Sequence, residues 1–159
     1  MDRFDLKILK VLQKSGRKKN ADLARELGVA PSTMLERIRR LEESGVVRGY
    51  RANLDPKMLG LDIQAFISVT LSRHEADIIR KFEEGIRKIP HIRACYNLSG
   101  RYDYLLHVFV SDLDQLGKLI KTQITSLAGF GKSETFLTFS EIKSDNGLPI
   151  TKDLFKRGE

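Results

Sequence analysis

Two spacings of apolar residues divide the chain. Over residues 2–44 the apolar positions recur every three or four residues, which is typical of helices with one buried face. From residue 63 onward, short β-branched and aromatic runs alternate with longer helical patterns. The pattern therefore predicts a helical segment followed by a segment of mixed α and β structure.

Three helices are predicted in the first segment. The first is capped by Asp2 and runs to about Ser15. The second follows the capping residue Asn20 and ends at Gly28, and the third runs from Pro31 to about residue 44. Because so few residues separate the second and third helices, with a glycine in the turn, the pair predicts a helix-turn-helix. The third helix is expected to bury Met34, Leu35, Ile38 and Leu41.

The outward face of the third helix is the candidate DNA-reading surface. At 100° per residue it lies opposite Leu35, Ile38 and Leu41. Arginine reads guanine or holds phosphate, and small hydroxyls fit close to a groove floor. A solvated helix also carries i,i+4 charge pairs, which is the alternative interpretation of this face. The predicted DNA-binding residues are Ser32, Thr33, Glu36, Arg37, Arg39 and Arg40.

An extended segment follows the third helix. Residues 46–54 alternate polar and apolar positions around a glycine, which favours either a small wing or a strand of a linker. Arg48 in this segment is expected to contact the phosphate backbone. The Asp55–Pro56 pair ends the segment, so the winged helix-turn-helix domain is predicted over residues 1–60.

Charge is distributed unevenly between the two segments. Residues 1–60 contain 14 Lys and Arg against 8 Asp and Glu, whereas residues 61–159 contain 14 against 13. A basic segment joined to a nearly neutral one indicates a module that binds a polyanion. Together with the helix-turn-helix, this favours double-stranded DNA over a membrane surface as the partner.

The second segment has the element order of a ferredoxin-like domain. Strands are predicted over residues 63–71, 92–98, 103–110 and 133–143. Helices are predicted over residues 75–88 and from Ser111 or Asp112 to about Leu127. The order strand, helix, strand, strand, helix, strand is the split βαβ arrangement. We therefore predict an α+β chain, with a βαββαβ domain over residues 61–143 and a polar tail over residues 144–159.

Several function classes are not favoured by the sequence. His74, His91 and His107 lie on different elements without a partner at catalytic or metal-binding spacing, so we expect neither an enzyme nor a metal site or other cofactor. The single cysteine, Cys95, lies in an apolar stretch and is expected to be a buried, inert thiol. The sequence has no apolar run of membrane-spanning length and no signal-peptide pattern, so we expect a soluble cytoplasmic protein.

The sequence resembles the leucine-responsive and asparagine-responsive (Lrp/AsnC) family of transcription regulators over nearly its whole length. Each matching fragment is weak alone, but their order and spacing are specific. The fragments are Asp5-Leu6-Lys7-Ile8-Leu9, Leu12-Gln13, Leu23-Ala24, Leu27-Gly28, Leu35-Glu36-Arg37-Ile38-Arg39-Arg40-Leu41-Glu42, Gly45-Val46-Val47, Gly49-Tyr50, Asp55-Pro56, Leu59-Gly60 and Ser99-Gly100-Arg101-Tyr102-Asp103-Tyr104-Leu105-Leu106.

The resemblance implies how the second domain is used. In the family this domain dimerises through its sheets, and the dimers assemble further, commonly to octamers. It also implies that a small effector, usually an amino acid, binds at the dimer–dimer interface beside the turn over residues 99–103. The matching effector-binding positions are Asn97, Leu98, Ser99, Gly100 and Asp103, facing Leu137 and Thr138 on the last strand.

Two alternatives remain at this stage. Gly100 and Asp103 either bind an effector, through exposed N–H groups and a carboxylate, or merely form the turn. The whole protein is either an effector-responsive, sequence-specific regulator or an architectural protein that wraps DNA with little response to ligands. A change in assembly size on adding a ligand distinguishes the two functions.

Overall fold

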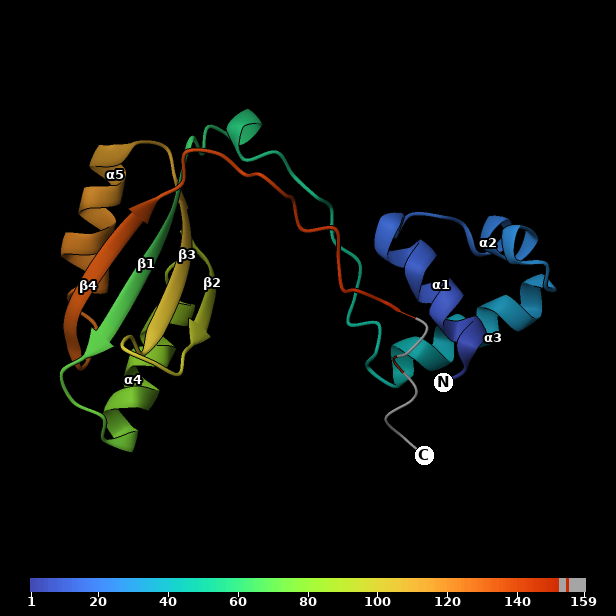
Figure 1. Ribbon diagram of the computed structural model, residues 1–159, viewed down its shortest axis with the longest axis horizontal. Helices are drawn as coiled ribbons and strands as arrows, with labels where there is room; N and C mark the ends of the chain where they lie inside the picture. Colours follow the sequence, from blue (N-terminus) through green and yellow to red (C-terminus); the bar gives the residue numbers. More distant parts are fainter. Residues whose placement is uncertain (152–153, 155–159) are drawn as a thin grey trace. The chain divides into compact units, whose positions relative to one another are not determined.

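Three helices follow one another at the start of the chain (Figure 1): α1 (Arg3–Lys14), α2 (Asn20–Leu27) and α3 (Pro31–Glu43). Each agrees with the predicted helix to within about a residue at either end. Asp2 caps α1 as predicted, since its side chain accepts hydrogen bonds from the N–H groups of Phe4 and Asp5. The three helices share one apolar cluster, formed by Ile8, Leu12, Leu23, Ala24, Met34, Ile38 and Leu41.

The prediction that Leu35 is buried is wrong. Its side chain is 56% exposed, whereas Met34, Ile38 and Leu41 are buried as predicted. The outward face was placed opposite Leu35, Ile38 and Leu41. Because neighbouring residues differ by 100° around a helix, the buried face formed by Met34, Ile38 and Leu41 has its centre about 30° away from that reference. This rotation moves Arg37 toward the edge of the core and turns Arg39 further outward.

The chain after α3 forms no strand in this structure. Residues 48–55 form neither a helix nor a strand, although a small wing or a linker strand was predicted over 46–54. A strand needs a neighbour to supply its hydrogen bonds, and the backbone at Gly49 (φ 138°) interrupts the extended run. A 3₁₀ turn, η1 (Lys57–Leu59), then precedes the sheet.

Four strands and two helices form the rest of the fold in the predicted order. The strands are β1 (Ile63–Leu71), β2 (Ile92–Asn97), β3 (Tyr104–Val110) and β4 (Phe130–Leu137). Helix α4 (Ala76–Arg87) joins β1 to β2, and α5 (Leu113–Lys118) continues as the π-helix η2 (Leu119–Ile124) before β4. The strands lie in the order β2-β3-β1-β4 with every neighbouring pair antiparallel. This arrangement confirms the predicted ferredoxin-like domain.

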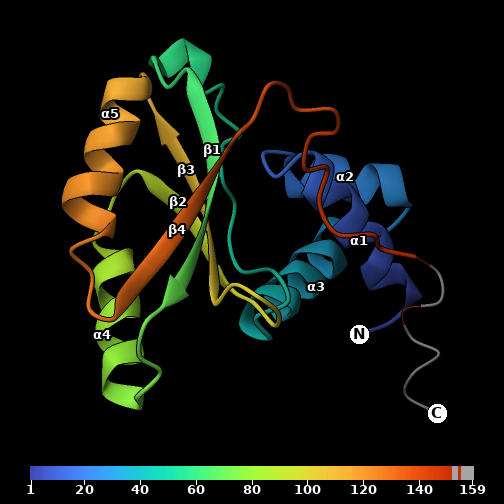
Figure 2. The ribbon, with the colours of Figure 1, turned by 60° about the vertical axis from the view of Figure 1, so that its left-hand side comes forward.

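The two helices cover one face of the sheet, as Figure 2 shows. Alternate residues of β1 and β3 point into this helix-covered face and are buried: Ala65, Ile67, Val69, Leu71, Tyr104, Leu106, Val108 and Val110. The other face carries partly exposed residues, among them Phe66, His107 and Phe109. The Phe66 ring stacks on His107 with centroids 4.5 Å apart, and the His107 ring is tilted against Phe109 with centroids 4.9 Å apart. One face of the sheet is therefore closed by helices and the other is open.

The last strand, β4, begins three residues before the predicted strand over 133–143 and ends six residues before it. Strand β4 pairs only with β1, and the pairing ends where β1 begins, at Ala65 opposite Leu137. One further hydrogen bond joins the Thr138 N–H to the Gln64 carbonyl at 3.0 Å. Phe139 is fully exposed, so the apolar residues that suggested a longer strand have no sheet to join.

The structure describes residues 1–151 and Leu154 in a computed structural model, in which the chain divides into two units. One unit contains residues 54–142; the other contains residues 1–53 together with the segment that begins at Lys143. The predicted tail therefore groups with the helical unit as far as it is described, and its last residues lie outside the described part. No helix among the described residues has the length and apolarity needed to cross a membrane.

Gly131 allows β4 to bulge against β1. Lys132 is opposite Thr70 and Phe130 is opposite Leu71, which leaves Gly131 as the extra residue. A Cβ atom at this position would lie 2.7 Å from the Thr70 carbonyl oxygen and 2.9 Å from the Ser72 nitrogen. These backbone atoms cannot move aside without breaking the ladder.

We predict that Gly131→Ala destabilises the protein by about 1–3 kcal/mol, because the added methyl group overlaps backbone. The matched control is Gly117→Ala in α5, where an added Cβ meets nothing within 4 Å. That change should be neutral or stabilise by up to about 1 kcal/mol. Thermal unfolding of both variants measures the difference, and equal melting temperatures would contradict the assignment of the bulge.

Candidate DNA-reading face and effector site

The exposed face of α3 carries most of the predicted DNA-binding residues. Ser32 and Thr33 are exposed in its first turn, and Glu36, Arg39 and Arg40 are exposed further along. The helix begins with Pro31 and has no side-chain cap, so the backbone N–H groups of its first turn point outward uncapped. Hydroxyls, guanidinium groups and unbonded N–H groups thus lie together on one helix.

Arg37 occupies a different place from the one predicted. Its side chain is 26% exposed, and its guanidinium donates to Asp2 Oδ2 at 2.7 Å and to Asp5 Oδ1 at 2.8 Å. It also lies over the Phe4 ring, 5.1 Å from the centroid. In the free protein Arg37 therefore joins α3 to the start of α1, and it is not directed outward with Arg39.

Asp5 is the buried centre of this contact and was not identified from the sequence. Its carboxylate is fully buried, and it accepts hydrogen bonds from Arg37, from the Asp2 N–H at 2.8 Å and from Arg40 at 3.4 Å. The Arg37 hydrogen bond, followed by the Asp5 N–H, lowers the pKa of Asp2 to about 2, while Asp2 and then Asp5 raise the pKa of Arg37. The Asp2/Asp5 spacing of a capping box was the signal in the sequence that pointed here.

The remaining predicted basic residues are accessible to a ligand. Arg40 is 61% exposed despite its long contact with Asp5, and Arg39 is 74% exposed while it pairs with Glu43 at 2.6 Å. Arg48 is exposed in the segment after α3. An exposed ion pair contributes little stability, so Arg39 can exchange Glu43 for phosphate or base atoms at small cost. Arg40 contacts the buried Asp5 only at 3.4 Å, and Arg37 at 2.8 Å is the nearer partner of that carboxylate.

The predicted effector turn joins β2 to β3. The Asp103 carbonyl accepts hydrogen bonds from the Leu98 N–H at 2.8 Å and from the Asn97 side chain at 3.1 Å, which closes the turn. Ser99 and Gly100 are exposed at its tip, and Gly100 has a φ of 141° that other residues rarely adopt. Five of the predicted effector residues are thus brought together.

The Asp103 carboxylate has a structural role within the chain. Its Oδ2 accepts the Leu71 N–H at 2.7 Å, and its Oδ1 contacts His74 Nε2 at 3.0 Å. Burial acts to raise the pKa of Asp103, but the hydrogen bonds from Leu71 and His74 outweigh it and lower the pKa below its usual value. His74 is 59% exposed, so Oδ1 is the oxygen that a ligand cation can approach.

Leu137 and Thr138 are not brought to this turn within one chain. Asp103 binds the end of β1 at Leu71, whereas Leu137 and Thr138 pair with the beginning of β1 at Ala65 and Gln64. Leu71 lies six residue steps along the strand from Ala65, which is about 20 Å. The expectation that these residues face the turn therefore fails for a single chain.

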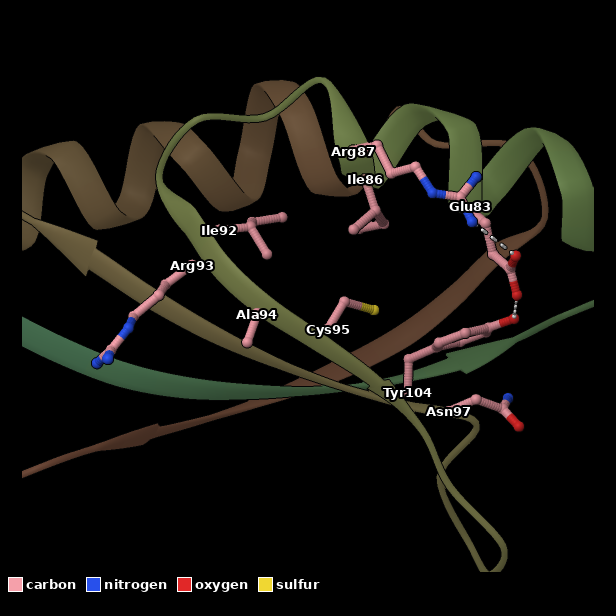
Figure 3. A pocket seen from close by; sticks show the side chains of 9 residues that line it. All are labelled: Glu83, Ile86, Arg87, Ile92, Arg93, Ala94, Cys95, Asn97 and Tyr104. Carbon is pink, nitrogen blue, oxygen red and sulfur yellow. Dashed lines mark hydrogen bonds and ion pairs between the residues drawn. The ribbon is translucent and has the colours of Figure 1, made fainter. Parts of the chain in front are cut away.

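A cavity of about 430 Å³ lies between α4 and β2 (Figure 3). Of the predicted effector residues, Asn97 alone lines it. Glu83 accepts a hydrogen bond from the Tyr104 hydroxyl at 3.0 Å and pairs with Arg87 at 3.5 Å. Burial raises the pKa of the Cys95 thiol in this cavity to about 11, as expected for an unreactive cysteine. The described residues contain no group of three or more potential metal ligands.

Two family models match the sequence. One, described as winged helix-turn-helix DNA-binding, covers residues 1–48. The other, described as the Lrp/AsnC ligand binding domain, covers residues 64–148, more than half of the chain. The chain belongs to the Lrp/AsnC family. The resemblance inferred from the sequence motifs is thereby confirmed.

Similar proteins support this family over almost the whole chain. The leucine-responsive regulatory proteins of Haemophilus influenzae and Escherichia coli K12 are 36% and 37% identical over 150 residues, which cover 94% of this chain and 90% and 92% of theirs. A transcriptional regulator of Neisseria meningitidis, solved as its complex with L-methionine, is 35% identical and has a TM-score of 0.90. An AsnC family regulator of Agrobacterium tumefaciens is 31% identical, with a TM-score of 0.89. The alignments cover 94% of this chain and 97% of each of these two.

Family membership decides the general function. This Lrp/AsnC member is a DNA-binding transcription regulator with a ligand-binding domain that responds to an effector. Its relatives are regulators, which confirms the expectation that the chain is not an enzyme. The functional question is therefore which residues contact DNA and which bind the effector.

We predict that Arg37→Ala destabilises the helical unit by about 3 kcal/mol, because it leaves the buried Asp5 carboxylate without its nearest cation. Arg39→Ala is the matched control: it removes an exposed pair on the same helix and should change stability by less than about 0.5 kcal/mol. Chemical denaturation of both variants, followed by helical circular dichroism, gives the two values. If Arg37→Ala unfolds like wild type, the Asp5 contact does not stabilise the unit.

Proposed function

We propose that the chain reads duplex DNA through the exposed face of α3 and binds a small α-amino acid at a site shared between copies. The direct DNA contacts are assigned to Ser32, Thr33, Glu36, Arg39 and Arg40, with Arg48 on the phosphate backbone. Arg37 holds α3 in place through Asp5 and reaches phosphate only if DNA displaces one of its carboxylates. The exposure of this face, together with the excess positive charge of the same unit, supports the assignment.

The effector site is proposed to be composite, and the separation within β1 is the observation that carries this proposal. One copy contributes Asn97, Leu98, Ser99, Gly100 and Asp103, and another copy contributes Leu137 and Thr138. About 20 Å separates the two sets within one chain, so a molecule the size of an amino acid cannot touch both unless two copies meet. The effector then links copies, and its binding is coupled to assembly.

The chemistry of the turn suits an α-amino acid. The ammonium group is proposed to displace His74 from Asp103 Oδ1, while Oδ2 keeps its hydrogen bond to the Leu71 N–H. The exposed backbone around Gly100 supplies N–H groups for the carboxylate. The Neisseria meningitidis regulator, solved with L-methionine, supports an amino acid as the ligand class.

Assembly is proposed to start at the open face of the sheet. The rings of Phe66, His107 and Phe109 lie on it in a row of neighbouring contacts, and Tyr96 and Phe136 are exposed on the same face. Exposed aromatic surface of this kind is typical of a protein interface. We propose a homodimer formed through this face and a higher oligomer, an octamer, formed from dimers by the effector sites. The protein acts in the cytoplasm, where its DNA lies.

We predict that Arg40→Ala weakens binding to operator DNA by about 1–3 kcal/mol if Arg40 makes a bidentate base contact. Thr33→Ala should change sequence preference more than overall affinity, because a hydroxyl adds little to phosphate attraction. Arg25→Ala, at an exposed site of α2, is the matched control of equal charge. Binding is measured on selected DNA at several salt concentrations. Unchanged operator affinity of Arg40→Ala would contradict the assigned face.

We predict that Asp103→Asn lowers effector affinity by about thirtyfold to several thousandfold, since a desolvated charge pair loses one partner. An asparagine oxygen can still accept the Leu71 N–H, so the turn is kept and DNA binding without effector should stay near wild type. His74→Ala is the control: it removes only the exposed group that the ammonium displaces, so effector affinity should stay within about fivefold.

The effector is chosen by a thermal-shift screen of the twenty amino acids and measured by calorimetry, with native mass recorded in parallel. An amino acid that binds wild type, changes its oligomer mass and fails on Asp103→Asn supports the proposed site. Equal affinities for wild type and Asp103→Asn would leave Asp103 as a turn residue. If no amino acid binds or alters the mass, the architectural, DNA-wrapping function replaces the effector-responsive one.

A further inference from the structure

Residues 146–150, which we name the strap, lie against α1 of the helical unit, as the red C-terminal trace in Figure 2 shows. The Gln13 side chain holds the strap at one residue. Its Oε1 accepts the Leu148 N–H at 2.6 Å, and its Nε2 donates to the Leu148 carbonyl at 3.1 Å. One amide thus satisfies both polar groups of a backbone residue, as a neighbouring strand does.

The contact recognises the backbone of the strap and not its side chains. The Leu148 side chain is 78% exposed, so it adds little to the contact. Gly147, by contrast, has a φ of 88°, and a Cβ atom there would lie 2.6 Å from Gln13 Oε1. The Asp145 side chain accepts the Gly147 N–H at 2.8 Å and fixes the turn before it. The strap therefore needs a glycine at 147 and tolerates other residues at 148.

We propose that the strap is a second attachment between the two units, closed by Gln13, which restrains rotation of the DNA-reading unit. The chain passes from the helical unit to the sheet unit after residue 53 and returns before residue 143. A unit held by one linker turns about it, whereas a second attachment removes most of that freedom. The linker after residue 53 and the strap both belong to the same chain, so the proposed restraint needs no second copy.

The restraint has a consequence for DNA binding, which rests on the proposed dimeric reading of two half-sites. Two reading helices bind together only when they face the same side of the duplex, at half-sites about one helical turn apart. DNA-reading units that are restrained in this way are already oriented, so they bind poorly to half-sites that lie on opposite sides of the duplex. DNA-reading units that turn freely bind half-sites on the same side or on opposite sides of the duplex, but they lose conformational entropy when they bind.

The docking of the strap is tested without DNA, by hydrogen exchange of the full chain. The Leu148 amide should exchange about tenfold or more slowly than an open amide, because its hydrogen bond must first break. Gln13→Ala and Gly147→Ala should abolish this protection, and Leu148→Ala should retain it. Alanine at position 13 suits an exposed helix site, so α1 stays intact. An unprotected amide in wild type overturns the proposal, whatever the DNA measurements give.

The restraint is tested with DNA carrying one half-site, two half-sites one turn apart, or two shifted by half a turn. Wild type should prefer the in-phase pair, and in Gln13→Ala and Gly147→Ala this preference should fall about tenfold or more. Affinity for one half-site should change less than about twofold, and Leu148→Ala should behave as wild type. An unchanged preference in variants that have lost protection overturns the restraint. If wild type binds no paired half-sites, the dimeric reading fails instead, and the exchange result still decides docking.

The strap is assigned to α1 of its own chain. A photo-crosslinking residue in place of Leu148 checks this assignment, because the side chain at this position is exposed beside the contact. Crosslinked product of single-chain mass, with the link mapped to α1, supports the strap. Product of two-chain mass shows that the segment docks on another copy and overturns a restraint within the chain.

Discussion

The central position of β1 is the constraint on which the sheet unit depends. It pairs with β3 on one side and β4 on the other, and its alternate residues fill the core beneath α4 and α5. The same pairing fixes where the chain's chemistry lies, since the Asp103 turn is bound at one end of β1 and Leu137 at the other. Because helices cover only one face, the aromatic rings on the opposite face stay partly exposed.

In the helical unit, a single buried carboxylate has a comparable role. Asp5 draws Arg37 and Arg40 of α3 toward the start of α1, and this contact sets the rotation of the reading helix about its own axis. A buried charge is stable only when it is paired, so the rotation cannot drift without an energetic cost. The face that α3 presents to DNA is thus determined by a contact on its inner edge.

The sequence predicted the order of elements, the helix bounds and the family, because these depend on local periodicity and motif spacing. It failed where long-range packing decides. The exposure of Leu35 depends on where α1 lies, and the bounds of β4 depend on the length of its partner β1. Asp103 was identified as chemically active, but its bond to the Leu71 N–H joins residues 32 positions apart, which no local pattern reveals.

The contact between Gln13 and Leu148 also has a consequence for the order in which parts of the chain fold. Gln13 lies in α1 and Leu148 follows β4, so the two partners are 135 positions apart and all four strands lie between them along the chain. Domains generally fold as units while the chain emerges, so the helices can assemble long before this contact forms. Helices that have folded without this contact lack the second attachment that we propose between the two units. As proposed, closure of the strap follows the folding of both units, so the DNA-binding motif is complete before the restraint exists.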